Sequence, residues 1–301
     1  MSDSTQNSSL IDSPETKIQA LQDQATRLES PCGEGVMVWH RWEGPSEQHD
    51  RPPLVLLHGG FGSWTHWARA IPLLREHVTV IAADSPGLGD SADAPLPHTS
   101  SGLAEIISNG LNHILPSAQR FHLTGFSFGG MLGSVVAARQ GNRCLSFTAV
   151  GASGFGDLHY IVEGIRMPEP EMTDAEINNL HRDNLNVLMF DDPSSADSLA
   201  IYIHRTNVNR ARVRSRRLSV SSALVDALPL ITARIGGIWG ELDVTGGGIQ
   251  KIRARSDMFR SIQSDACFDV ISGAGHWVMY EAAEIFSEKL IQQIQTSDAS
   301  E

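Results

Sequence analysis

The stretch that most constrains the fold is Gly125-Phe126-Ser127-Phe128-Gly129, a serine held between aromatic residues and glycines. An apolar run at residues 121–124 precedes it and predicts a strand, and small and apolar residues at 131–139 predict a helix after it. Glycines let the backbone pass through a sharp strand–turn–helix connection where a Cβ would collide. The serine hydroxyl then protrudes at the carboxyl end of the strand. Ser127 is therefore a candidate nucleophile, and the N–H of Phe128, at the helix start, is placed to donate to an oxyanion.

Short apolar runs that predict strands recur along the chain, separated by segments of helical periodicity. The runs lie at residues 35–42, 54–57, 77–82, 121–124, 145–150, 231–239 and 266–271. Helices are expected at residues 14–28, 63–75, 102–115, 131–139 and 281–295. Alternating strands and helices favour the α/β class, with a mostly parallel sheet covered by helices on both faces. Residues 1–15 are rich in Ser, Asp, Asn and Gln and are expected to form a disordered tail.

Residues 155–228 interrupt this alternation, because they contain no buried-strand signal. Thr173 and Glu176 form a capping box that predicts the start of a helix, and Ser194 or Ser195 is expected to cap another. We interpret residues 155–228 as a helical lid. The lid is expected to be inserted into a core formed by residues 16–154 and 229–297.

Composition excludes several classes of function. A net charge of −12 at pH 7 argues against nucleic acid and anionic membranes as partners, and no apolar run approaches the ~18 residues of a membrane span. Three widely separated cysteines and a polar start without a secretory leader favour the cytoplasm. No His/Cys cluster has metal-ligand spacing and no glycine-rich phosphate loop is present, so neither a metal nor a cofactor is expected. The oligomeric state stays open, a homo-oligomer included.

A serine nucleophile needs a base within hydrogen-bond reach and an acid that orients the base. The carboxyl ends of parallel strands open on one edge of a sheet, so that loops from different strands can meet there. Asp243 follows the strand expected at 231–239, and His276 follows the strand expected at 266–271. The chain order Ser127, Asp243, His276 is typical of serine hydrolases with this architecture. The sequence therefore predicts a Ser-His-Asp triad.

Five motifs in this order make the chain resemble the α/β-hydrolase superfamily over about residues 33–297. They are His58-Gly59-Gly60, Asp84-x-Pro-Gly-x-Gly-x-Ser91, the serine turn, Gly240-x-x-Asp243 and Gly275-His276. The resemblance implies that Ser127 is the nucleophile, His276 the general base and Asp243 the orienting acid. It also implies an oxyanion hole made by the N–H of Phe128 with that of Gly60 or Phe61.

Other residues are alternatives for these roles or are expected nearby. His58 is expected to be a structural histidine, whereas Glu241 and Asp157 are alternatives to Asp243 as the acid. The side chains expected to line the substrate pocket are Trp64, Phe126 and Trp277.

Within the superfamily the chain is most similar to meta-cleavage-product hydrolases, which cut a C–C bond in dienoate ring-fission products, and to carboxylesterases. The resemblance to the first group rests on Gly275-His276-Trp277 and the glycine-rich loop after His58. That group typically carries Asn before the nucleophile, where this chain has Phe126. We therefore expect a serine hydrolase of a small, largely apolar ester or related acyl substrate. The alternatives are C–C hydrolysis and a receptor-like protein that binds a small ligand.

Six arginines between residues 205 and 217 bear on this choice. A planar guanidinium suits a carboxylate, so one of them over the nucleophile would favour the dienoate substrate. As a solvated surface they would favour the neutral ester. They are Arg205, Arg210, Arg212, Arg214, Arg216 and Arg217.

Overall fold

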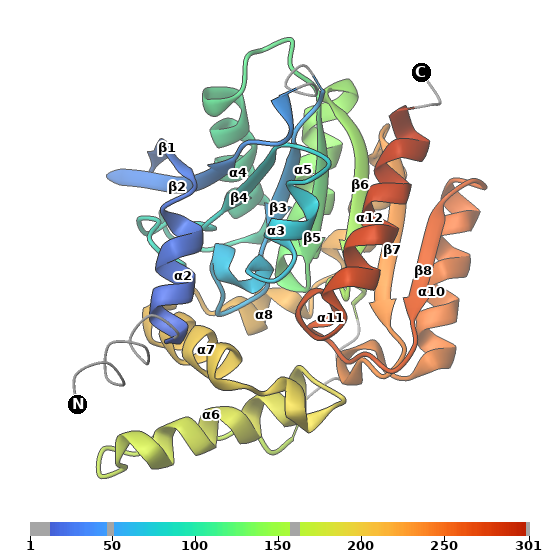
Figure 1. The fold of residues 1–301 in the computed structure, drawn as a ribbon. Coiled ribbons are helices and arrows are strands. Elements are labelled where there is room, and N and C mark those ends of the chain that lie inside the picture. The colour runs from blue at the N-terminus through green and yellow to red at the C-terminus, as the bar shows by residue number, and fades with distance from the viewer. Residues whose placement is uncertain (1–12, 47–50, 157–162, 299–301) are drawn as a thin grey trace.

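The computed structural model describes residues 13–46, 51–156 and 163–298, which form an eight-stranded sheet flanked by helices (Figure 1). The strand order is β1-β2-β4-β3-β5-β6-β7-β8. The first two pairings, β1 with β2 and β2 with β4, are antiparallel, and all the others are parallel. The strands are Thr26–Cys32, Gly35–Trp42, Leu54–Leu57 (β3), Val80–Ala83 (β4), Phe121–Phe126, Cys144–Val150, Arg234–Gly240 and Cys267–Ile271. The α/β class and the mostly parallel sheet are thus confirmed.

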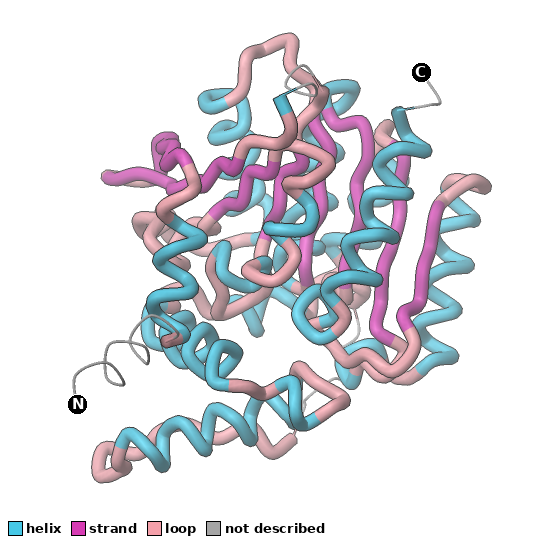
Figure 2. Tube along the Cα trace, in the orientation of Figure 1, coloured by secondary structure: helices cyan, strands magenta, loops and turns pink. Residues whose placement is uncertain are grey.

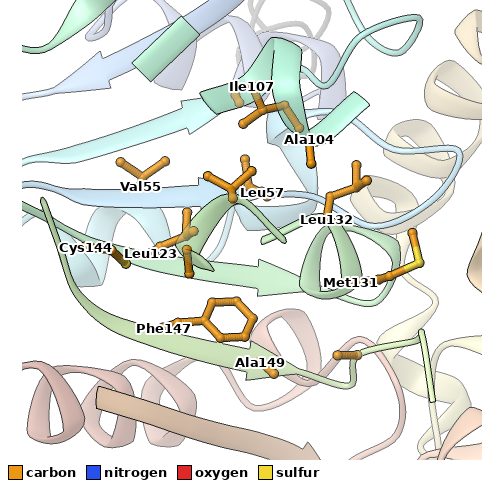
Figure 3. Close-up of a cluster of buried hydrophobic side chains, with 14 of the residues drawn as sticks. Val55, Leu57, Ala104, Ile107, Leu123, Met131, Leu132, Cys144, Phe147 and Ala149 are labelled. Carbon is orange, nitrogen blue, oxygen red and sulfur yellow. The ribbon is translucent and has the colours of Figure 1, made fainter. Parts of the chain in front are cut away.

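The central strands are buried on both faces, as β3 illustrates. Val55 and Leu57 point into one core cluster, together with α4 and α5 (Figure 3), and Leu54 and Leu56 point into the other. Figure 2 shows helices on both sides of the strands. One face carries α4 (Ser100–Ile114), α5 (Phe128–Gln140) and α10 (Ile249–Ile262), and the other carries α3 (Ile71–Leu74), α11 (Val278–Glu281) and α12 (Ala283–Asp298). None of the helices in the described part of the chain combines the length and apolarity needed to cross a bilayer.

The expectations for the N-terminus are partly wrong. The helix expected from Pro14 begins there as α2 (Pro14–Gln22), so Pro14 and Glu15 do not belong to the tail to which they were also assigned. Its first turn is capped by the Ser13 hydroxyl, at 3.1 Å from the N–H of Thr16. The helix ends at Gln22 because residues 26–32 instead pair with β2 as an edge strand. Residues 1–12 lie outside the described part of the chain.

Two other helices differ from expectation. Residues 63–75 do not form one helix but a 3₁₀ turn (Trp64–Trp67) followed by α3, because Pro72 in the first turn of α3 cannot donate a hydrogen bond to a preceding turn. The C-terminal helix starts at Ala283, after the short α11, and continues to Asp298.

The described part of residues 155–228, the segment expected to be inserted, contains several helices and no strand. They are α6 (Asp174–Leu188), α7 (Ser198–Arg210), α8 (Ser215–Ser219), α9 (Ala223–Ala227) and 3₁₀ turns at Pro193–Ser195 and Leu228–Leu230. The capping box of α6 is confirmed. The cap of α7 is not Ser194 or Ser195 but Asp197, whose Oδ1 accepts the N–H of Ala200 at 2.8 Å. In Figure 1, α6 and α7 lie together beyond one end of the strands; that the segment is a lid stays a prediction.

Buried histidines make the fold sensitive to acid. Burial lowers the pKa of His40 and of His58 to about 4 and that of His204 to about 3. An unfolded chain binds protons at these positions below pH ~6.5, and stability decreases as the pH is lowered wherever the unfolded state binds more protons. Burial raises the pKa of Asp84 from its ordinary value of 3.8 to about 7. Between these two pH values the folded state binds the extra proton, so Asp84 makes the protein more stable as the pH is lowered and opposes the histidines.

We predict that the free energy of unfolding falls between pH 6.5 and pH 4.5. Three histidines opposed by one carboxyl give a slope of about 2–3 kcal/mol per pH unit. Urea unfolding at several pH values measures it. His204→Gln should flatten the slope, whereas His113→Gln, on the exposed end of α4, should not. A free energy of unfolding that stays constant or rises on acidification would contradict this reading.

We also predict that Gly129→Ala destabilises the fold by about 1–3 kcal/mol, because overpacking forces the backbone to move. A Cβ at Gly129 would lie 2.3 Å from the carbonyl oxygen of His58 and 2.5 Å from that of Leu57. The matched control is Gly102→Ala in α4, where a Cβ would meet only the Thr99 hydroxyl at 3.0 Å. Thermal unfolding should separate the two variants, and equal effects would contradict the prediction.

Candidate active site

The serine turn joins β5 to α5 with a strained backbone. Ser127 has φ +51° and ψ −113°, in a region that residues with a Cβ rarely adopt. Its N–H donates to the carbonyl of Val150, at the end of β6, at 2.8 Å. A Cβ at Gly125 would lie 2.3 Å from the carbonyl oxygen of Gly129, so only glycine permits this close approach. The Ser127 side chain is left half-buried at the carboxyl end of the sheet.

The expected acid and base are directly hydrogen-bonded. His276 Nδ1 lies 2.9 Å from Asp243 Oδ2, and both residues are buried. The N–H and the hydroxyl of Thr245 each donate to Asp243 Oδ1 at 2.8 Å. Burial by itself raises the pKa of Asp243, but the nearby His276 and the bonds from His276 and Thr245 outweigh it and hold that pKa below its ordinary value. Asp243 is therefore an ionised acceptor that fixes the orientation of the His276 ring. Thr245 was not identified from the sequence.

The acid–base pair lies beside the strand end that holds Ser127. A Cβ on Gly151, the residue after Val150, would lie 3.1 Å from His276 Nδ1 and 3.2 Å from Asp243 Oδ2. The ring of Phe126 lies 4.8 Å from that of His276 between centroids. Within the described residues no hydrogen bond joins Ser127 to His276. Hydrogen bonds between nucleophile and base are often loose without substrate, so the triad stays a prediction.

The expected oxyanion donors lie on adjacent backbone segments. A Cβ on Gly60 would lie 3.7 Å from the Cβ of Phe128 and 2.4 Å from the hydroxyl oxygen of Ser215. Ser215, in α8, thus covers the loop after β3 and was not found from the sequence. Phe61 follows with φ +51° and a side chain that is 41% exposed. Whether Gly60 or Phe61 is the second donor stays a prediction.

His66 connects the three loops of the site. Its Nδ1 accepts the N–H of Gly59 at 3.2 Å, and its ring centroid lies 5.6 Å from Phe126 and 5.0 Å from Trp277. The Trp277 indole donates to the His66 carbonyl at 2.8 Å. Burial holds the pKa of His66 well below its ordinary value, so the ring is neutral and carries its proton on Nε2.

The remaining expected site residues lie in other surroundings. Trp64 packs its ring against His40 and Trp42, with centroids 5.2 Å from each, and belongs to the core. His58 is satisfied structurally, because its Nε2 accepts the N–H of Ser85 at 2.9 Å and its Nδ1 lies 2.7 Å from the Gly59 carbonyl. The Glu241 carboxylate accepts the Ser272 hydroxyl at 2.5 Å instead of contacting His276, and Asp157 lies outside the described residues.

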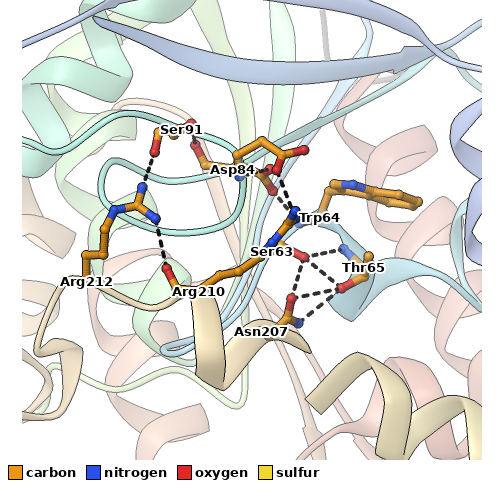
Figure 4. Close-up of polar contacts among 9 residues, drawn as sticks. Ser63, Trp64, Thr65, Asp84, Ser91, Asn207, Arg210 and Arg212 are labelled. Atoms are coloured by element: carbon orange, nitrogen blue, oxygen red, sulfur yellow. Dashed lines mark hydrogen bonds and ion pairs between the residues drawn. The ribbon is translucent and has the colours of Figure 1, made fainter. Parts of the chain in front are cut away.

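The six arginines between residues 205 and 217 fall into two groups. Three form ion pairs, between Arg205 and Asp174 (2.5 Å), Arg210 and Asp90 (2.8 Å), and Arg212 and Asp93 (2.5 Å). Figure 4 shows Arg212 bound to the carbonyls of Ser91 and Arg210. The others, Arg214, Arg216 and Arg217, are exposed.

One group of metal-ligand types appears that sequence spacing did not reveal. A ring nitrogen of His40 and carboxylate oxygens of Asp84 and Asp90 lie within 4.8 Å of one another. Asp84 already accepts the N–H groups of Trp64 (2.8 Å, Figure 4) and Asp90 (2.9 Å), and Asp90 pairs with Arg210. These protein contacts account for both carboxylates, and we assign no metal to them.

Similar proteins place this geometry in a family. The chain is 26% identical over 248 residues to the 2-hydroxy-6-oxononadienedioate/2-hydroxy-6-oxononatrienedioate hydrolase of Comamonas testosteroni, covering 78% of this chain and 84% of that protein. Two solved structures are similar in fold. A putative lipase from Acinetobacter baumannii has a TM-score of 0.72, 18% identity, and 96% and 98% coverage of the two chains. A meta-cleavage product hydrolase has a TM-score of 0.69, 18% identity, and 89% and 98% coverage.

The family model of the alpha/beta hydrolase family matches residues 54–288. The match begins at the first residue of β3 and includes Ser127, Asp243 and His276. The chain therefore belongs to the alpha/beta hydrolase family.

Proposed function

We propose that this protein is a serine hydrolase that cleaves a small, largely apolar ester or related acyl substrate. The bond between His276 and Asp243, beside the strained turn at Ser127, carries the proposal. Ser127 attacks the carbonyl carbon while His276 takes the hydroxyl proton, and Asp243 stabilises the imidazolium that forms. His276 then protonates the leaving alcohol, and a water activated by His276 releases the acid from the acyl-enzyme.

The oxyanion that forms during attack needs hydrogen-bond donors that are already in place. The N–H of Phe128 is one donor, and the N–H of Gly60 or Phe61 is the other. The N–H of Phe128 is free for this role because it belongs to the first residue of α5, which has no acceptor one turn earlier within the helix. His66 holds the loop after β3 in position by accepting the N–H of Gly59. Neutral aromatic side chains around the turn favour an apolar acyl group.

A second candidate is hydrolysis of a C–C bond in a dienoate ring-fission product. The name of the Comamonas testosteroni relative, a dienedioate hydrolase, favours it. Such a substrate carries carboxylates, and a cationic side chain close to the nucleophile would be expected to bind them. Three of the six arginines are engaged by Asp174, Asp90 and Asp93, and the other three are exposed. This arrangement favours the neutral ester.

Ser127→Ala tests the nucleophile. We expect kcat for p-nitrophenyl esters of graded chain length to fall by roughly 10⁴ to 10⁶, the range for losing a triad serine. Far-UV circular dichroism should be unchanged, because the half-buried hydroxyl adds little to the core. Ser261→Ala, on the exposed face of α10, is the control. Activity within tenfold of wild type would remove Ser127 from its role, and a wild-type protein without multiple turnovers would favour a receptor.

The arginines distinguish the two substrate classes. We expect each single Arg→Ala change at the six positions to leave the ratio of kcat/KM for an acidic dienoate and a neutral ester unchanged. If one arginine binds a substrate carboxylate, its loss should cost about 1.5–3 kcal/mol for the acidic substrate only, the worth of a hydrogen bond to a charged group. Arg27→Ala, on the edge strand β1, is the control. A selective loss at any of the six positions would favour the C–C hydrolase.

A further inference from the structure

The loop that carries His276 is bound to the inserted segment by one carboxylate. Glu281, the last residue of α11, folds back so that its Oε2 accepts the N–H of Gly275 at 2.6 Å. Its Oε1 accepts the N–H of Asp191 at 3.0 Å and that of Asp192 at 2.8 Å. Glu281 therefore joins the residue before His276 to the connection between α6 and α7.

Backbone and ring contacts reinforce this junction. The N–H of Trp277 donates to the carbonyl of Met189 at 2.8 Å. The rings of Phe190 and Trp277 stack with 5.5 Å between centroids and 9° between planes. A Cβ on Gly275 would lie 2.8–2.9 Å from the backbone atoms of residues 189–191, so the two segments touch through their main chains. Residues 189–192 cannot shift without moving residues 275–277.

The other side of the inserted segment is bound to the oxyanion loop. Asn207, in α7, contacts the hydroxyls of Ser63 at 2.8 Å and Thr65 at 3.1 Å (Figure 4). These are neutral side-chain contacts, whereas Glu281 places a half-buried charge between two backbone segments. Burial raises the pKa of Glu281, and its three N–H donors oppose that effect. A half-buried carboxylate with three backbone donors holds its partners in fixed positions.

We propose that Glu281 is a positioning residue that couples the α6–α7 connection to the catalytic base. When the two segments are joined, the loop that carries His276 is held in place beside the turn of Ser127; when they separate, the base is free to move away from it. The proposal rests on the proposed function, because it needs His276 to act as the base. Glu281 was not identified as a site residue from the sequence, since it lies five residues from His276 and in no motif.

Glu281→Gln tests the coupling. The side chain keeps its size, but an amide has one acceptor oxygen, so one of the two segments loses its bond. We expect kcat to fall about tenfold to a hundredfold, since small misplacements of reacting groups cost this much, while KM changes by less than about threefold. The matched control is Glu284→Gln, an exposed residue one turn later in α12, which should leave kcat unchanged. A purely structural role would lower the melting temperature and leave kcat of the folded enzyme intact.

A double-mutant cycle with Phe190→Leu provides a second test that does not depend on Glu281→Gln alone. Phe190→Leu loosens the same junction and leaves the carboxylate in place, so it should also lower kcat. The double variant should lose at least about threefold less than the product of the single losses, as expected for residues that act through one contact. Additive losses, or Glu281→Gln within about twofold of wild type, would overturn the proposal. If Glu281→Gln does not fold, an unchanged kcat in Phe190→Leu overturns it.

The same assays separate the coupling from the proposed function. If Ser127→Ala and His276→Ala retain activity, the proposed function fails. If these variants are inactive while Glu281→Gln matches wild type, only the coupling fails.

Discussion

The left-handed backbone of Ser127 is the constraint on which the site depends. A residue with a Cβ in such a conformation costs on the order of 1–3 kcal/mol and persists only where its surroundings impose it. Here the Ser127 N–H is held by Val150 of β6, Gly125 lies against the carbonyl of Gly129, and Gly129 lies against the end of β3. Adjacent parallel strands end at the same edge, so this packing also fixes where the loop after β3 passes.

The rest of the site is assembled around that turn by segments distant in the sequence. Asp243 and His276 arrive from β7 and β8 at the other side of β6, where Gly151 lies against them. His66 lies within the loop after β3 and Ser215 lies against it, and this loop is predicted to offer the second oxyanion donor. The inserted segment contacts both halves, through Asn207 and through Glu281. The geometry that supports catalysis is thus a property of the whole carboxyl edge.

The sequence predicted the features that depend on local chemistry. Leu54–Leu57 forms a strand buried on both faces, as its unbroken apolar run predicts, and the glycines around Ser127 form the expected tight turn. The chain order of Ser127, Asp243 and His276 then predicted that their side chains lie close together at one edge of the sheet. Of these three, the structure joins Asp243 and His276 by a hydrogen bond.

The sequence did not predict features that depend on contacts across the fold. Residues 26–28 carry helical periodicity but pair with β2, so tertiary pairing overrode local propensity. Trp64 stands near the oxyanion loop in sequence, yet its ring packs against Trp42. Ser215 and Glu281 can be recognised as site residues only through their contacts with backbone segments that are distant in the sequence. Pattern and spacing carry no signal for such partners, and the ion pairs of Arg205, Arg210 and Arg212 belong to the same category.

Covalent labelling of the nucleophile is the most direct test of a serine activated by His276 and Asp243. Wild-type protein would be treated with an active-site-directed fluorophosphonate, digested, and mapped by mass spectrometry, in parallel with His276→Ala. We expect one adduct per chain, on Ser127, that forms far more slowly when His276 is replaced. An adduct on another residue, or labelling of Ser127 at the same rate in both proteins, would contradict it.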